Sequence, residues 1–256
     1  MKRVVYSGIE GRSLGYWGLM GVLGLFILMA AGSFFFMEHS GHHATGMDNQ
    51  IVWGIPHVFA IFLIVAASGA LNVASISSVF NQKIYKPLAR MSAILALTLL
   101  AGGLAVLVLD LGRADRLVVA MTSYNFKSIF AWNIYLYTGF FVIGLTYLWT
   151  MFDPAMHKYT RTAGTAAFLW RLALTTGTGS IFGFLSARQG YDAAVMAPMF
   201  IIMSFAFGKA IFMILLIGTY RYTERSMSAD LIMRLKNLFG VFVAAVLYFK
   251  VVFHIT

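Results

Sequence analysis

The feature that most constrains this 256-residue chain is a series of seven long apolar stretches, separated by short polar segments. A helix that crosses the hydrocarbon core of a membrane needs about 20 mostly apolar residues, and each stretch is long enough. We therefore predict an all-α integral membrane protein, built as one domain over residues 1–256 with about seven membrane-spanning helices. The expected spans are 15–37, 53–80, 91–110, 128–151, 163–186, 195–220 and 237–255.

The distribution of lysine and arginine predicts the orientation of these helices. The chain holds 19 Lys and Arg but only 9 Asp and Glu, which gives a formal net charge of +10. Cytoplasmic loops carry an excess of basic residues, so we place the N-terminus in the cytoplasm and the loops around 38–50, 113–127 and 188–192 outside. Topology beside a lipid surface thus explains the charge, and no nucleic-acid partner is needed. The basic residues expected on the cytoplasmic side are Lys2, Arg3, Arg12, Lys83, Lys86, Arg90, Lys158, Arg161, Arg221, Arg225, Arg234 and Lys236.

Composition excludes several kinds of redox centre from this chain. It has no cysteine, so it cannot hold a cysteine-ligated iron–sulfur cluster, a thiolate zinc site or a covalently attached c-type haem. A b-type haem needs two histidines that face each other, and His57 and His254 are expected at comparable depths on different helices. A di-histidine haem anchor is therefore an alternative, while no metal site is expected.

Asp110 is the first candidate for chemistry, because it directly follows the apolar run 105–109 at the expected outer end of a helix. Arg113 and Arg116 follow it closely, and Tyr124 lies in the same outer segment. A carboxylate beside guanidinium groups forms a charge-assisted pair. Such a pair would either pin the helix end at the interface or take part in proton transfer.

His57 is the second candidate, near the outer start of the expected second helix. Pro56 suits a first helical turn, so His57 is predicted in the first turns of the bundle, one turn after Trp53. An imidazole at this place can hydrogen-bond a quinone carbonyl and pass on its proton. The plain alternative is an interfacial histidine that is hydrogen-bonded to a neighbour.

Polar residues inside the expected spans suggest a proton route. Lys209 falls in the middle of a span and should face the bundle, whereas Arg171 is nearer the inner face and can extend towards it. Asn133 and Tyr135 add polar atoms that need partners in lipid. Lys209, Asn133 and Tyr135 would line a route towards Asp110, although hydrogen bonds between packed helices explain the last two equally well. An ion or proton transporter, with Lys209 and Arg171 on its substrate path, is a further alternative.

Three motifs together resemble the NrfD/PsrC family of polysulfide-reductase-like membrane subunits. They are Trp-Gly-Ile-Pro-His at 53–57, Leu-Asp-Leu-Gly-Arg-Ala-Asp-Arg at 109–116 and Gly-Thr-Gly-Ser-Ile-Phe-Gly at 177–183. The second is the most specific, with Ala114 where the family usually has proline. The resemblance covers nearly the whole chain and is strongest to the sulfur-metabolism branch called DsrP. Relatives of that branch continue after the seventh helix, so the end at Thr256 predicts a fragment or a truncated relative.

This resemblance implies a subunit of a respiratory complex in a bacterial inner membrane, which exchanges electrons with menaquinone or ubiquinone and holds no haem or iron–sulfur cluster. In the family its partners are an iron–sulfur ferredoxin-like subunit and, in some complexes, a c-type cytochrome or a molybdenum subunit. His57 and Asp110 would be the catalytic residues. The quinone-binding residues implied on this sequence are His57, Trp53, Asp110, Arg113, Arg116 and Tyr124.

Overall fold

The computed structural model describes residues 11–48, 50–51, 53–111, 116–123, 125–184, 193–223 and 227–255. Within these ranges the regular structure is helical, which confirms the predicted fold class. The 3₁₀ helices are η1 (His42–Thr45), η2 (Lys83–Leu88) and η4 (Pro154–Tyr159). The α-helices are α1 (Leu14–Ser40), α2 (Ile55–Ala70), α3 (Asn72–Ser78), α4 (Ala89–Leu109), α5 (Leu117–Thr122), α6 (Ile129–Phe152), α7 (Thr160–Gly183), α8 (Met196–Tyr222) and α9 (Ala229–Ile255).

Six helical segments of the described residues are long and apolar enough to cross a membrane, so the chain is a multi-pass membrane protein. They are Leu14–Ser40, Ile55–Ser78, Lys83–Leu109, Ile129–Phe152, Met196–Tyr222 and Ala229–Ile255. The remaining expected span corresponds to α7, which has 24 residues but is less apolar because it carries Arg161, Arg171 and several threonines. It packs against both α6 and α8. The count of seven spans stays a prediction.

Two helices begin earlier than the sequence indicated. The span that ends at Leu109 begins at Lys83 rather than at 91, and α9 begins at Ala229 rather than at 237. Arg234 therefore lies on a helix and not in the expected cytoplasmic loop. The physical reason is that Leu231 and Leu235, one turn apart, are buried against α8 and η2, while Arg234 between them is exposed.

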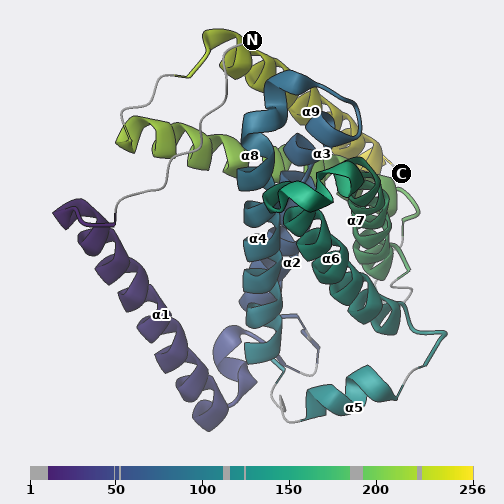
Figure 1. The fold of residues 1–256 in the computed structure, drawn as a ribbon. Coiled ribbons are helices and arrows are strands. Elements are labelled where there is room, and N and C mark those ends of the chain that lie inside the picture. The colour runs from purple at the N-terminus through teal and green to yellow at the C-terminus, as the bar shows by residue number, and fades with distance from the viewer. Residues whose placement is uncertain are drawn as a thin grey trace.

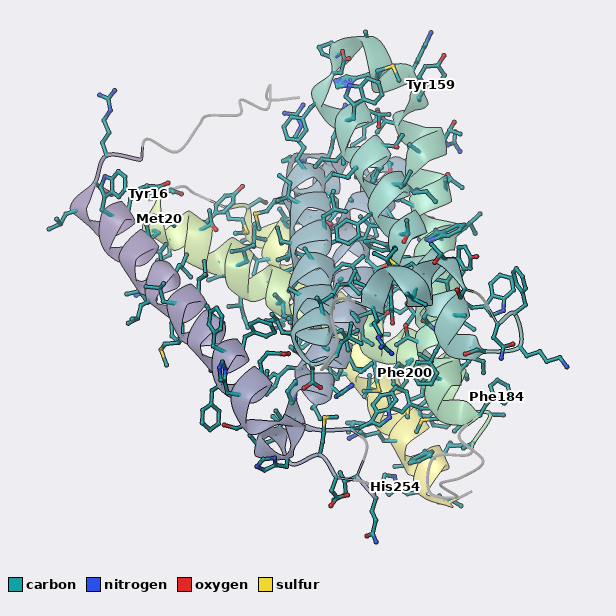
Figure 2. The ribbon with its side chains drawn as sticks, turned by 90° about the horizontal axis from the view of Figure 1, so that it is seen from below. Tyr16, Met20, Tyr159, Phe184, Phe200 and His254 are labelled. Carbon is teal, nitrogen blue, oxygen red and sulfur yellow. The ribbon has the colours of Figure 1, made fainter. Side chains whose placement is uncertain are left out.

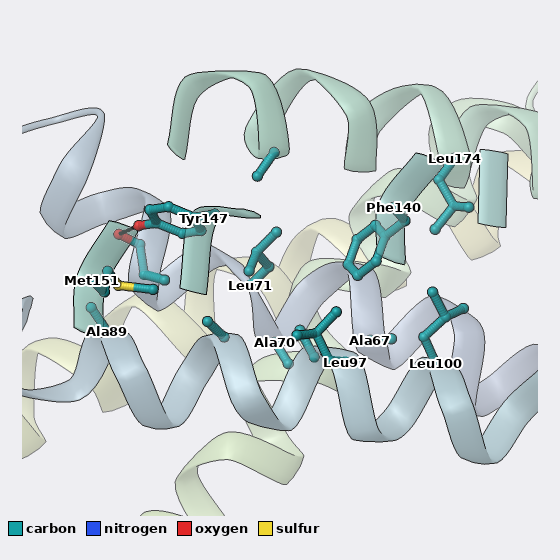
Figure 3. Close-up of a cluster of buried hydrophobic side chains, with 14 of the residues drawn as sticks. Ala67, Ala70, Leu71, Ala89, Leu97, Leu100, Phe140, Tyr147, Met151 and Leu174 are labelled. Atoms are coloured by element: carbon teal, nitrogen blue, oxygen red, sulfur yellow. Dashed lines mark hydrogen bonds between the residues drawn. The ribbon is translucent and has the colours of Figure 1, made fainter. Parts of the chain in front are cut away.

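The main core is a cluster of small and branched apolar side chains contributed by α2, α3, α4, α6 and α7 (Figure 3). Tyr147 is fully buried there, and its hydroxyl donates to the carbonyl of Ala74 at 3.0 Å, which satisfies the polar end of the ring. Tightly packed small residues let the helix backbones approach each other in lipid. The labelled members are Ala67, Ala70, Leu71, Ala89, Leu97, Leu100, Phe140, Tyr147, Met151 and Leu174.

α2 and α8 cross so closely that only glycine fits at the crossing. A Cβ atom added to Gly69 would overlap the backbone of Ser204, and one added to Gly208 would overlap the backbone of Gly69 and Ala70. Ser204 and Gly208 lie four residues apart, on one face of α8, as in other close helix pairs in membranes. The crossing fixes the helix that carries His57 against the helix that carries Lys209.

α1 stands apart from the packed helices. None of its residues is buried, and Figures 1 and 2 both show it separated from α6 and α7. Ser13 caps its start by accepting a hydrogen bond from the amide of Tyr16 at 3.1 Å. With 27 residues and a mean hydropathy of 2.2 over its most apolar window, α1 is suited to be surrounded by lipid.

Candidate functional site

The structure gathers aromatic rings at one end of the bundle, where α2, α6 and α8 begin and α4 and α7 end. We call this the His57 end. The ring of Trp53 lies 6.0 Å from that of Phe130 and 5.0 Å from that of Phe182, measured between centroids. Phe182 in turn stacks on Phe200 at 5.3 Å. These contacts join helices that are distant in sequence, and they form one wall beside His57.

His57 and Asp110 form an acid–base pair at this end. Nδ1 of His57 lies 2.8 Å from Oδ2 of Asp110, the first residue after α4. The side chain of Asp110 is 1% exposed and that of His57 is 22% exposed. A molecule that approaches the pair can therefore reach the imidazole, whereas the carboxylate lies behind it. No described residue donates a hydrogen bond to the second oxygen, Oδ1, of Asp110.

Local chemistry explains why both residues lie at helix ends. Pro56 occupies the first turn of α2, where its missing N–H is no loss, and this places His57 one position later. The amide of Asp110 donates to the carbonyls of Val106 and Leu107, which closes the last turn of α4. Gly54 packs so tightly against Thr45 that a side chain would not fit there.

Trp53 lies in the predicted site, with its ring centroid 5.3 Å from that of His57. Arg116 is exposed where α5 begins. Arg113 and Tyr124, two further predicted quinone-binding residues, lie outside the described residues. Three aromatic residues of the wall were not among those predicted for the site: Phe130, Phe182 and Phe200. In the sequence, each is an aromatic residue close to the same expected membrane face as Trp53. Many lipid-facing residues have the same property, so it does not single out a site.

The residues of the predicted proton route lie in three different surroundings. Asn133 is buried, donates to the carbonyl of Gly177 at 3.3 Å and accepts from the hydroxyl of Thr178, so it links α6 to α7. Tyr135 is 37% exposed, and its ring lies 6.1 Å from that of Trp132. Lys209 is buried near the middle of α8. Continuity between these residues and Asp110 stays a prediction.

The di-histidine alternative gains no support from the geometry. His254 is exposed at the end of α9, with Nδ1 2.7 Å from the carbonyl oxygen of Lys250 on the same helix. Figure 2 places it at the edge of the molecule in that view, whereas Phe200 lies among the packed helices. The ring of His57 faces Asp110 instead. Among the described residues, no group of three or more His, Asp or Glu side chains is placed to hold a metal ion.

Comparisons with known proteins find sequence similarity to subunits of several oxidoreductases. An integral membrane subunit of the Hdr-like menaquinol oxidoreductase from Archaeoglobus fulgidus is 30% identical over 97% of this chain and 62% of its own length. A putative membrane subunit of dimethyl sulfoxide reductase from Halobacterium salinarum is 24% identical over 89% of this chain and 57% of its own length. A subunit of the selenate reductase from Mesobacillus selenatarsenatis is 20% identical over 79% of this chain and 54% of its own length.

The chain thus spans little more than half the length of these relatives. The model of the family described as polysulphide reductase, NrfD, matches residues 43–256, which include every α-helix of the described residues except α1. That range also contains the three motifs on which the resemblance was based. A match over most of the chain is decisive, and the chain belongs to the NrfD family of membrane proteins.

Proposed function

We propose that this chain is the quinone-interacting membrane subunit of a respiratory oxidoreductase complex, with its quinone site at the His57 end. The observation that carries the proposal is the pair of His57 and Asp110, in which an accessible imidazole lies against a buried carboxylate beside the ring of Trp53. The names of the relatives support it, because one is a subunit of a menaquinol oxidoreductase and two are subunits of reductases.

The pair fits the acid–base part of quinone chemistry. Oxidation of a quinol releases two electrons and two protons, so its site needs a proton acceptor beside the ring. Because Nδ1 of His57 faces Asp110, Nε2 on the opposite edge of the ring is free to receive the hydroxyl of a quinol. Asp110 positions the imidazole and stabilises it once it carries the proton. His57 is then the residue that touches the substrate.

The aromatic wall supplies the second requirement, a flat apolar surface for a ring. Trp53 and Phe182 meet edge to face, and such rings leave faces against which another ring packs favourably. Met196 and Met199 border Phe200 in a buried apolar cluster, which suits the start of an isoprenoid tail. The site would thus bind the quinone ring by packing and orient it through His57.

Electrons must leave through another protein, because a chain without cysteine cannot hold a cysteine-ligated iron–sulfur cluster. We propose an iron–sulfur ferredoxin-like subunit as the direct partner, with a c-type cytochrome or a molybdenum subunit beyond it. It would dock on the His57 end, where the path from the quinone is shortest. The proposed setting is a bacterial inner membrane, the proposed quinone is menaquinone or ubiquinone, and the proposed terminal substrate is a sulfur compound.

A photoreactive menaquinone analogue tests the location of the site. After illumination of the protein in lipid nanodiscs, the cross-linked peptides are identified by mass spectrometry. We expect labels on Trp53, Phe130 or Phe182, and competition by excess unmodified menaquinone. Labels that resist competition, or that fall only outside these three residues, such as on the exposed Tyr248 of α9, would contradict the proposed site.

A further inference from the structure

A second polar centre lies away from the His57 end, near the middle of the helices. Arg171 of α7 is 0% exposed and Lys209 of α8 is 2% exposed. Half of a 27-residue helix is about 20 Å long, so Lys209 lies roughly that far along α8 from the His57 end. Cationic side chains at this depth of a membrane bundle are costly, and each needs a physical reason.

Aromatic rings lie against both cations. The guanidinium carbon of Arg171 lies 4.8 Å from the ring centre of Phe168 and 4.6 Å from that of Phe205. Phe205 stacks on Phe242 of α9 at 4.8 Å, and Nζ of Lys209 lies 5.5 Å from the ring of Phe242. Ring faces attract cations but supply no negative charge, so they offset only part of the cost of burial.

The donors of this centre lack acceptors. Nε and Nη2 of Arg171, Nζ of Lys209 and Nδ2 of Asn72 are buried, and no described residue accepts from them. Nη1 of Arg171 lies 3.5 Å from the carbonyl of Ser68, which is a long contact. The hydroxyl of Ser68 lies 2.6 Å from that of Thr175 and 3.2 Å from the carbonyl of Arg171, so it serves the backbone rather than the guanidinium.

These donors lie on three elements that pack against one another. Arg171 contacts Ser68 on one side and the ring of Phe205 on the other. Asn72 follows Ser68 by four residues and Lys209 follows Phe205 by four residues, so each lies about one helical turn from a contact of Arg171. The three donor groups thus lie on neighbouring turns of α3, α7 and α8, which pack against one another.

Among the described residues, no carboxylate lies at this depth to serve as a counter-charge. Those that the structure describes are at helix ends or between helices, at Glu38, Asp48, Asp110, Asp153 and Asp230. Burying a charge without a partner of opposite charge is strongly unfavourable, so an outside anion would relieve this centre.

We propose that this centre binds a small monovalent anion of the halide class, held by Arg171, Lys209 and Asn72. The N–H groups of the two cations would donate charge-assisted hydrogen bonds to the anion. A halide fits because it is compact and carries a single charge. A doubly charged oxyanion would lose far more hydration on entering a site walled by Phe168, Phe205 and Phe242, and it brings oxygens that these few donors cannot all reach.

Thermal unfolding of the full chain in lipid nanodiscs tests this inference. The melting temperature is measured against the concentration of sodium bromide, with sodium gluconate holding the ionic strength constant. We expect a saturable rise of several degrees, because a ligand that binds only the folded state stabilises it by mass action. In bromide-soaked crystals, an anomalous difference peak is expected within hydrogen-bond distance of Arg171 and Lys209. A bromide-independent melting temperature together with no such peak would overturn the proposal.

Variants separate this site from general salt effects. Lys209→Met and Arg171→Met should each abolish the bromide-dependent rise, whereas Lys209→Arg keeps a cation and should retain it. Lys236→Met removes an exposed charge from α9 and is the matched control. A full rise in both methionine variants, or its loss in the control, would refute the site. None of these measurements involves quinone, so the result is independent of the function proposed above.

Discussion

The two polar centres of this bundle differ in where their charge is balanced. At the His57 end, an imidazole meets a carboxylate of the same chain, so a positive charge on the imidazole has a negative partner beside it. Around Arg171 and Lys209 both charged groups are cations, and no carboxylate of the described residues lies at that depth. The first centre is therefore suited to moving protons, and the second to holding something negative.

The largest expected effect follows from breaking the balanced pair. In the assembled complex, His57→Ala and Asp110→Asn should each lower kcat for quinol oxidation by about 10²-fold or more, because general acid–base catalysis contributes on that scale. Stopped-flow absorbance of a menaquinol analogue measures it. His254→Ala removes an exposed histidine near the end of α9 and should keep its turnover. Unchanged rates in both site variants would show that the pair does not take part in quinol oxidation, and would contradict the difference in function between the two centres.

The next largest effect is expected at the crossing of α2 and α8, which fixes the helix of His57 against the helix of Lys209. Gly208→Leu should destabilise the bundle by about 1–3 kcal/mol or more, since the added side chain has no room against α2. The melting temperature measures this in nanodiscs. Gly218→Leu is the matched control on the same helix, because nothing lies within 4 Å of a Cβ atom added there. Equal stability of the two variants would show that α2 and α8 do not meet as described.

A smaller effect should distinguish packing from proton transfer at the His57 end. Trp53→Ala removes one face of the aromatic wall, and ring contacts of this kind contribute about 0.5–1.5 kcal/mol beyond the buried area. We expect KM for the quinol to rise up to about tenfold, with kcat changed much less. Trp149→Ala, an exposed residue near the other end of α6, is the control. A fall in kcat with unchanged KM would mean that Trp53 acts on the chemistry instead.

Asn133 tests the predicted proton route against simple helix packing. Its amide links α6 to α7, and such hydrogen bonds average about 0.6 kcal/mol in membranes. Asn133→Leu should therefore lower the melting temperature slightly, and turnover at the His57 end should follow the amount of folded protein. A loss of turnover in fully folded protein would support the proton route through this residue.

The smallest effect belongs to an ion pair in solvent, which serves as a reference for both centres. Asp230 and Arg234 are bonded at 3.0 Å one turn apart on α9, with side chains 58% and 57% exposed. Asp230→Asn should cost only about 0.3–0.5 kcal/mol at low salt, and less at high salt, because the charges are screened. Chemical unfolding at two salt concentrations measures it. A salt-independent loss would indicate that the pair is more buried than it is here.

The membrane spans were predictable because runs of about 20 apolar residues leave few other folds open. The start of α9 was not, because the charged residues Asp230, Arg234 and Lys236 lie within its first eight positions and indicate a polar loop. His57 and Asp110 were both candidates because of their chemistry and position. Their contact was not, because no local pattern relates the start of one helix to the end of the next, and the carboxylate was expected to meet arginines.

The separation of α1 from the packed helices determines which properties of the protein its substitutions can affect. The family match begins at residue 43, just after this helix, and none of the buried core rests on it. Substitutions in α1 should therefore affect its contacts with lipid and with neighbouring proteins more than the stability of the packed helices. Changes in α1 should thus alter the contacts of the protein with its surroundings in the membrane and leave the chemistry at the His57 end unchanged.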